Sequence, residues 1–185
     1  MAQTPSNMLP LGTRAPAFTL SDTVSGRSFS LDHLKGGQGT VVMFICNHCP
    51  FVKHINAGLV QAARDYKGKG ISFIAISSND VDNYPDDSPE KMKAVALQLG
   101  YPFPYLYDAT QDVAKAYQAA CTPDLYLFDA SLACVYRGQF DDARPGNGAP
   151  VDGKDLRAAM DALLAGRPVN PAQKPSVGCN IKWKK

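Results

Sequence analysis

Two cysteines separated by two residues, Cys46 and Cys49, are the side chains of this chain best suited to chemistry. They follow an apolar, β-branched run at 40–45 and precede a helix-like segment at 54–66, so they lie at a predicted strand-to-helix junction. This spacing allows both sulfurs to meet on one helical turn, where the helix N-terminus stabilises a thiolate on the first cysteine. The pattern predicts thiol–disulfide exchange, with Cys46 as the nucleophile and Cys49 as the resolving thiol.

The composition is that of one globular domain. The chain has 185 residues, of which 45% are hydrophobic and 19% are charged, and this is enough to build a core. The net charge of +2 is spread without a long run of like charge, which argues against nucleic acid and membrane surfaces as partners. No segment approaches the ~20 apolar residues of a membrane span, and residues 1–12 lack a signal-peptide pattern, so we expect a cytoplasmic protein.

Hydrophobic periodicity predicts strands that alternate with helices. Strands are expected at 40–45, 71–76 and 103–107, with one hairpin from 18–20 and 28–30 and another from 124–128 and 133–136. Helices are expected at 54–66, 112–120 and 154–164, and Ser88-Pro89-Glu90 is typical of the start of a helix that ends near Leu99. The alternation indicates an α/β fold with a central sheet.

The ends of the chain and one internal segment are expected to lie outside this core. We divide the chain into a loose N-terminal arm at 1–15, a domain at 16–167 and a tail at 168–185. The tail is expected to pack on the domain through Ile181 and Trp183. The acidic, proline-containing segment 79–89 has irregular carboxylate spacing, which predicts a solvated loop rather than a calcium site.

Several further motifs together resemble the thioredoxin fold and its redoxin branch. They are Thr122-Pro123 before the late hairpin, Gly12-x-x-Ala15-Pro16-x-Phe18-x-Leu20, and Ser30-Leu31-x-x-Leu34-Lys35-Gly36. From about Leu11 to Leu164 the chain is similar to the alkyl hydroperoxide reductase/thiol-specific antioxidant family and its thioredoxin-like reductases. The Cys46-Asn47-His48-Cys49-Pro50 motif and the ending Gly178-Cys179-Asn180-Ile181-Lys182-Trp183-Lys184 resemble a peroxiredoxin-like subgroup of that family.

The resemblance implies a central mixed β-sheet flanked by helices, with an N-terminal β-hairpin extension and a C-terminal tail. It also implies a cis peptide bond between Thr122 and Pro123, opposite the cysteine pair, where these residues shape the substrate groove. Two departures limit the functional inference. Aligned on Cys49, the peroxiredoxin proline and threonine are replaced by Val42 and Cys46, and Thr40 occupies the position of the buried thioredoxin acid.

The residues between the two cysteines are expected to tune the pair. His48 can be cationic near neutral pH and would favour a thiolate, which would make the pair more oxidising, and Asn47 lies beside it. Pro50 disfavours helical geometry at Cys49, so the helix is expected to start late or to have a distorted first turn. The expected partners are protein or small-molecule disulfides and a cellular dithiol reductant, with no cofactor and no bound metal.

The remaining cysteines leave alternatives open. The odd count of five favours catalytic or metal-binding thiols over structural disulfides. Cys134 is expected to be buried and inert, whereas Cys121 and Cys179 are possible additional redox thiols. One of these two could resolve a thiol peroxidase that uses Cys49 or Cys46. A non-enzymatic Cu(I) or Zn(II) module is the third alternative, with Cys46, Cys49 and His48 or His54 as ligands.

Overall fold

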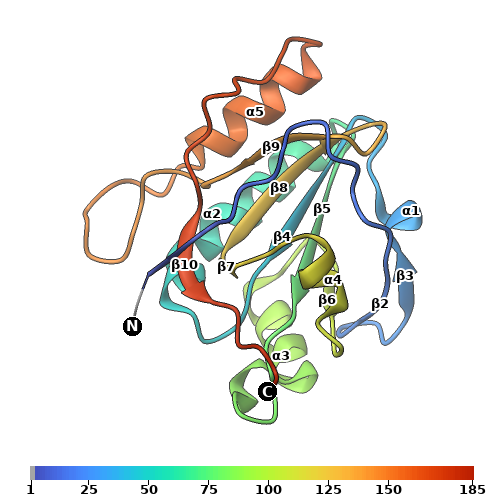
Figure 1. Cartoon of the computed structure of the whole chain (residues 1–185), viewed down its shortest axis with the longest axis vertical. Helices are drawn as coiled ribbons and strands as arrows, with labels where there is room; N and C mark the ends of the chain where they lie inside the picture. The colour runs from blue at the N-terminus through green and yellow to red at the C-terminus, as the bar shows by residue number, and fades with distance from the viewer. Residues whose placement is uncertain (1–2) are drawn as a thin grey trace.

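A seven-stranded mixed β-sheet carries the fold (Figure 1). The computed structural model describes residues 3–185. In spatial order the strands are β3 (Ser28–Ser30), β2 (Thr19–Asp22), β6 (Tyr105–Tyr107), β5 (Ile71–Ser77), β4 (Gly39–Phe44), β8 (Asp124–Asp129) and β9 (Cys134–Gly138). Strand β5 runs parallel to β4 and β6, and the other neighbours pair antiparallel. This confirms the predicted α/β class, the central mixed sheet and both hairpins.

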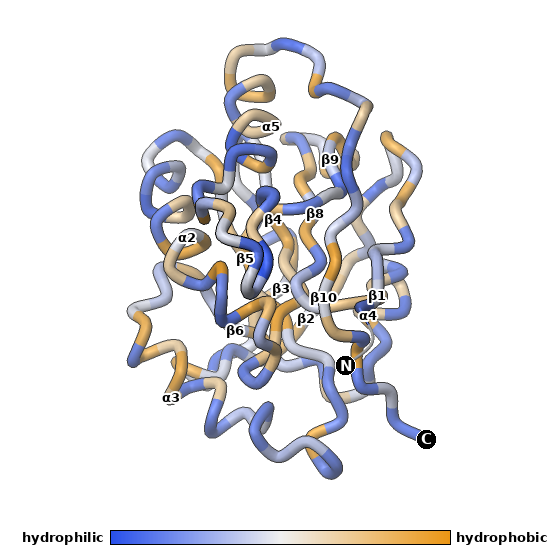
Figure 2. Tube along the Cα trace, turned by 90° about the vertical axis from the view of Figure 1, so that its left-hand side faces the viewer, coloured by the Kyte–Doolittle hydropathy of each residue, from blue (hydrophilic) through white to orange (hydrophobic). Residues whose placement is uncertain are grey.

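Helices cover both faces of the sheet. They are α1 (Leu31–Leu34), α2 (Pro50–Lys67), α3 (Pro89–Leu99), α4 (Asp112–Ala116) and α5 (Lys154–Leu164), with a short 3-10 turn, η1 (Pro85–Asp87), before α3. Alternate residues of β4 point to opposite faces: Val41 and Met43 pack with α2, α3 and α5, whereas Val42 and Phe44 pack with α1 and α4. Figure 2 shows the apolar stretches of the central strands β4 and β8 inside the fold.

The last predicted helix before the late hairpin is shorter than expected. Helix α4 ends at Ala116, although its periodicity suggested a helix to residue 120. Gln118 has a φ of 52°, in the left-handed region, and this conformation cannot continue a right-handed helix. The turn brings the chain back to the second, smaller sheet.

A three-stranded sheet joins both ends of the chain to the site. Its order is β1 (Thr4–Pro5), β10 (Val177–Asn180) and β7 (Cys121–Thr122), all antiparallel. In Figure 1 the red β10 runs beside the blue N-terminal segment. The expectation of a loose N-terminal arm is therefore wrong in this respect, because residues 4–5 are paired and Leu9 and Ala15 are buried.

The C-terminal residues pack on the body through one of the two expected side chains. Ile181 is 1% exposed and belongs to the core beside α1 and α4, whereas Trp183 is 41% exposed. Among residues 3–185, no helix combines the length and apolar character needed to cross a bilayer.

Candidate active site

The cysteine pair lies in the connection from β4 to α2. Helix α2 begins at Pro50, and Cys49 is its N-cap residue with an extended backbone (φ −68°, ψ 122°). A proline disfavours helical geometry in the residue before it, so the helix starts after the pair. The expectation that both cysteines share one helical turn is wrong, because Cys46 lies in the loop outside the helix.

The sulfur of Cys49 occupies the centre of the site. Cys49 is fully buried, and its Sγ lies 3.0 Å from the Sγ of Cys179 and 3.2 Å from the carbonyl oxygen of Thr122. A hydrogen bond from the Cys46 thiol lowers the pKa of Cys49 to about 4 against the opposing effect of burial, and bonds from Cys179 and the Val52 N–H add to this. The orphan N–H groups and dipole of α2 thus act on Cys49.

The surroundings of Cys46 oppose ionisation of its thiol. The hydrogen bond to Cys49, burial and the nearby Asp87 carboxylate all raise the pKa of Cys46. Its Sγ lies 3.5 Å from the hydroxyl oxygen of Thr122 and 4.0 Å from Nδ1 of His48. The sequence predicts a thiolate on the first cysteine, whereas the raised pKa of Cys46 and the lowered pKa of Cys49 run in the opposite direction.

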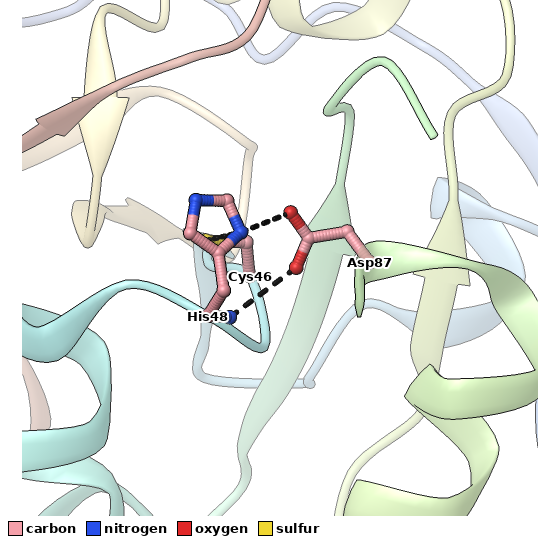
Figure 3. Close-up of side chains that lie close together, drawn as sticks. All are labelled: Cys46, His48 and Asp87. Carbon is pink, nitrogen blue, oxygen red and sulfur yellow. Dashed lines mark hydrogen bonds and ion pairs between the residues drawn. The ribbon is translucent and has the colours of Figure 1, made fainter. Parts of the chain in front are cut away.

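A buried carboxylate organises the loop between the cysteines (Figure 3). Asp87, at the end of η1, is completely buried, and its Oδ2 lies 2.6 Å from Nδ1 of His48. The other oxygen accepts the backbone N–H groups of Asn47 at 2.8 Å and His48 at 3.3 Å. The Asn79 side chain donates a further bond to Oδ2 at 2.8 Å. Asp87 therefore fixes both the loop backbone and the imidazole ring.

The pair formed by Asp87 and His48 is a charge-assisted hydrogen bond. The bond to Asp87 raises the pKa of His48 against its partial burial. Burial opposes ionisation of Asp87, but the bonds from His48 and Asn79 outweigh it and hold the pKa of Asp87 below its usual value. Protonated imidazole is thus favoured 4.0 Å from the Cys46 sulfur.

Sequence reasoning missed Asp87. It placed the carboxylates of 79–89 in a solvated loop, but Asp87 is 0% exposed, and Asn79 and Asp80 are also buried. Asp87 is 39 residues from His48, so no local periodicity connects them. The only local signal is its place between Pro85 and Pro89, two residues that restrict the loop.

Asn47 links the same loop to the sheet. Its side-chain N–H donates to the backbone oxygen of Asp86 at 2.9 Å, and its Oδ1 accepts the hydroxyl of Tyr105 at 3.0 Å. The ring of Tyr84 stacks on His48, with centroids 5.7 Å apart. The residues between the cysteines are therefore held from three directions, which limits the orientations of the pair.

Thr122 and Pro123 lie against the pair, as the resemblance implied. The peptide bond between them is cis, which confirms that expectation. The backbone oxygen of Thr122 faces Cys49, and its hydroxyl faces Cys46. The same two-residue strand β7 pairs with β10, in the register of Thr122 with Cys179.

The other thiols differ in their relation to the site. Cys179 touches Cys49, but the Cys121 thiol donates to the carbonyl of Pro123 at 3.6 Å, and burial raises its pKa. Cys134 lies on β9, where burial raises its pKa to about 11. His54 is exposed on α2. Cys179 is therefore the additional thiol that the structure brings to the pair.

One group of ligand atoms is compact enough to surround a metal ion. Within residues 3–185, ligand atoms of Cys46, His48 and Asp87 lie within 4.8 Å of one another. The facing nitrogen of His48 already shares a hydrogen bond with Asp87. Zn(II) prefers four ligands and Cu(I) prefers soft ones, whereas this group offers one sulfur. The donor set fits either ion poorly.

These features define a redox protein with the thioredoxin fold: a cysteine pair before a helix, facing a cis-proline across the end of a mixed sheet. The AhpC/TSA family model matches residues 11–136, which is more than half of the chain. The protein belongs to the AhpC/TSA family, and this membership supports a redox enzyme in general. No curated protein matches the chain significantly.

Three solved structures share this architecture over most or all of the chain. An uncharacterized conserved protein from Geobacillus kaustophilus is 62% identical, with 100% of this chain and 97% of that chain covered and a TM-score of 0.98. A hypothetical protein from Sinorhizobium meliloti is 52% identical, with 98% of each chain covered and a TM-score of 0.95. The thioredoxin domain of a thiol-disulfide oxidoreductase from Bacteroides vulgatus shares the fold at 22% identity, over 81% of this chain and 98% of that domain, with a TM-score of 0.60.

Proposed function

We propose that the protein is a thiol–disulfide oxidoreductase that cycles Cys46 and Cys49 between dithiol and disulfide. The observation that carries the proposal is the geometry of the pair: Cys46 lies in the loop before α2, Cys49 is the N-cap of α2, and both sulfurs face Thr122 before the cis-proline. A thiolate is the reactive form of cysteine, and a helix N-terminus and neighbouring donors stabilise it. Thr122 and Pro123 would form the wall against which a substrate disulfide lies.

The reaction follows from the position of the proton. Cys46 is 2% exposed and neighbours His48, whose side chain is 20% exposed, whereas Cys49 is fully buried. Cys46 is therefore the cysteine nearer to solvent, and we assign it the attack on the substrate. Cys46 passes its proton to Cys49 and attacks a substrate disulfide, which forms a mixed disulfide and releases one substrate thiolate. That thiolate takes the proton of Cys49. Cys49 then attacks the Cys46 sulfur, closes the internal disulfide and releases the second substrate sulfur.

His48 and Asp87 would set the redox balance of the pair. When a dithiol attacks the outer Cys46 sulfur of the internal disulfide, Cys49 leaves as the thiolate, which the N-terminus of α2 stabilises, while Asp87 and His48 hold the loop that carries Cys46. Stabilising the reduced form makes a pair more oxidising. A cellular dithiol would return the disulfide to the dithiol. We place this chemistry in the cytoplasm, because an odd number of cysteines without a disulfide framework is typical of a reducing compartment.

The test is reduction of insulin disulfides with dithiothreitol as the electron donor. We expect the wild-type protein to accelerate the reaction, and Cys46→Ser and Cys49→Ser to lose at least tenfold in rate. Cys134→Ser is the matched control, because that thiol is also buried but lies outside the pair. If Cys46→Ser reduced insulin as fast as the wild type, the proposal would be wrong.

Thiol peroxidase activity is the second candidate. It is favoured by the lowered pKa of Cys49 and by the Cys179 sulfur at 3.0 Å, which could resolve a sulfenic acid. The complete burial of Cys49 and the absence of the peroxide-orienting threonine weigh against it. Stopped-flow reaction with hydrogen peroxide separates the two candidates. A rate no faster than that of free cysteine would remove the peroxidase.

A further inference from the structure

The C-terminal strand β10 brings a third sulfur, that of Cys179, to the cysteine pair, and strands on both of its edges hold it there. Cys179 is 2% exposed, and its Sγ lies 3.0 Å from that of Cys49, about 1 Å longer than the ~2.05 Å of a disulfide bond. Its strand is held on one edge by β7 and on the other by β1.

Hydrogen bonds of the residues before and after Cys179 fix the position of β10 relative to Cys49. Before it, Ser176 donates its hydroxyl to the carbonyl of Pro123 at 2.5 Å. After it, the Ile181 N–H donates to the backbone oxygen of Ala120 at 3.1 Å. The backbone oxygen of Lys182 accepts the Asp80 N–H at 2.8 Å, and the Lys182 N–H donates to the side-chain oxygen of Asn79 at 2.8 Å. Gly178 has no room for a side chain, because a Cβ there would collide with the carbonyl of Thr122. The approach of the two sulfurs is thus specified by the packing of the strand.

We propose that Cys179 is a third redox thiol, which exchanges with the Cys46–Cys49 disulfide to form a Cys49–Cys179 disulfide. The proposal rests on the function proposed above, because that reaction supplies the first disulfide. Cys49 is the central sulfur, since its Sγ lies 3.0 Å from that of Cys179 and it is the disulfide partner of Cys46 in the proposed function. Among residues 3–185, the ligand atoms close enough to share a metal ion are those of Cys46, His48 and Asp87, and neither Cys49 nor Cys179 belongs to this group. Disulfide exchange through Cys49 therefore fits the arrangement better than a metal site with three thiolates.

The exchange balances without an external oxidant. The Cys179 sulfur attacks Cys49, a bond forms between these two atoms, and the bond from Cys49 to Cys46 breaks. Cys46 leaves with the electron pair and takes up the proton that Cys179 loses. The hydroxyl of Thr122, 3.5 Å from the Cys46 sulfur, can donate to the departing thiolate. A better-stabilised leaving thiolate departs faster.

The product differs from the first disulfide in two respects. It bonds the N-cap of α2 covalently to β10, and it frees the outer thiol, Cys46, for another disulfide while the protein remains oxidised. The protein would therefore store one disulfide either between Cys46 and Cys49 or between Cys49 and Cys179. The second disulfide is attached to β10, the strand that pairs with the N-terminal β1.

Peptide mapping distinguishes the two disulfides. No Lys or Arg lies between Gly36 and Lys53, so trypsin leaves Cys46 and Cys49 in one peptide, whereas Cys179 lies in another that ends at Lys182. The full-length protein is equilibrated in glutathione buffers of graded potential, quenched in acid, alkylated and digested. We expect the wild type to yield both the internal disulfide peptide and a cross-linked pair of peptides.

Two variants assign the cross-link. Cys46→Ser should form it with loss of two alkylatable thiols, and Cys179→Ser should lose it and retain only the internal disulfide. Cys134→Ser should match the wild type, and circular dichroism checks that each variant is folded. If Cys179 stayed fully alkylated in the wild type while the Cys46–Cys49 disulfide formed, the exchange would be refuted and the proposed function would stand. If neither disulfide formed, both would fail.

Discussion

Replacing Asp87 by Asn tests whether the buried carboxylate organises the cysteine loop. The change keeps the shape of the side chain but removes the charge that faces Nδ1 of His48 at 2.6 Å. A hydrogen bond to a charged group contributes about 1.5–3 kcal/mol, and loss of one partner of a buried ion pair costs about 3–5 kcal/mol. Because His48 is partly exposed and an amide oxygen still accepts the loop N–H groups, we expect a loss of about 3 kcal/mol in the free energy of unfolding.

This loss should depend on pH with a defined sign. The raised pKa of His48 stabilises the fold fully below about pH 6.5, its unfolded value, and the contribution is lost as the pH rises through the folded value. The lowered pKa of Asp87 stabilises the fold fully above about pH 3.9, and the contribution is lost as the pH falls through the folded value. The difference between wild type and variant should be largest between these limits.

The assay is urea unfolding at several pH values, with Asp86→Asn as the matched control. Asp86 is the neighbouring carboxylate, but its side chain is 69% exposed and pairs with Lys91 at the surface. We expect little change for the control. Histidine resonances should show a lower pKa for His48 in Asp87→Asn alone. Equal unfolding curves for the two variants, with no pH dependence of their difference, would refute the role assigned to Asp87.

Two further predictions follow from the sulfur cluster. Cys46→Ala removes the hydrogen bond that contributes most to lowering the pKa of Cys49, so this pKa should rise. The pH dependence of the alkylation of Cys49 by iodoacetamide should then shift toward alkaline pH, and an unchanged pH profile would contradict this prediction. Gly178→Ala forces β10 away from Thr122 and should destabilise the protein by about 1–3 kcal/mol and slow the Cys49–Cys179 disulfide. Gly37→Ala, which meets no atom within 4 Å, is its control in both measurements, and equal behaviour of the two variants would contradict the packing argument.

Much of the fold could be predicted because the local patterns are long. The strand at 40–45 is a continuous apolar run and the helix at 154–164 has an amphipathic pattern, and the structure has β4 at Gly39–Phe44 and α5 at Lys154–Leu164. The N-terminal pairing could not be found in this way. A strand of two residues, Thr4–Pro5, is too short to carry a periodic signal, and its partner lies at the other end of the chain.

The site was predictable where it depends on spacing within a few residues. Cys46 and Cys49 were recognised from their separation, and Pro50 correctly indicated that the helix starts after the pair, although it starts at Pro50 and not at the expected residue 54. The position of the charge was not predictable, because it depends on donors from Val52, Cys46 and Cys179 around one sulfur. The contact of Asp87 with His48 spans 39 residues and depends on how η1 folds over the loop.

The most direct test of the central claim is the reduction potential of the Cys46–Cys49 pair, measured by alkylation after equilibration with glutathione. We predict a reversible two-electron transition with a potential above the ~−270 mV of thioredoxin, because the α2 N-terminus and the donors around Cys49 stabilise the thiolate of the reduced form. Cys134→Ser should leave this potential unchanged. If Cys46 and Cys49 remained fully alkylated at every potential, the pair would not be a redox couple and the proposed function would be refuted.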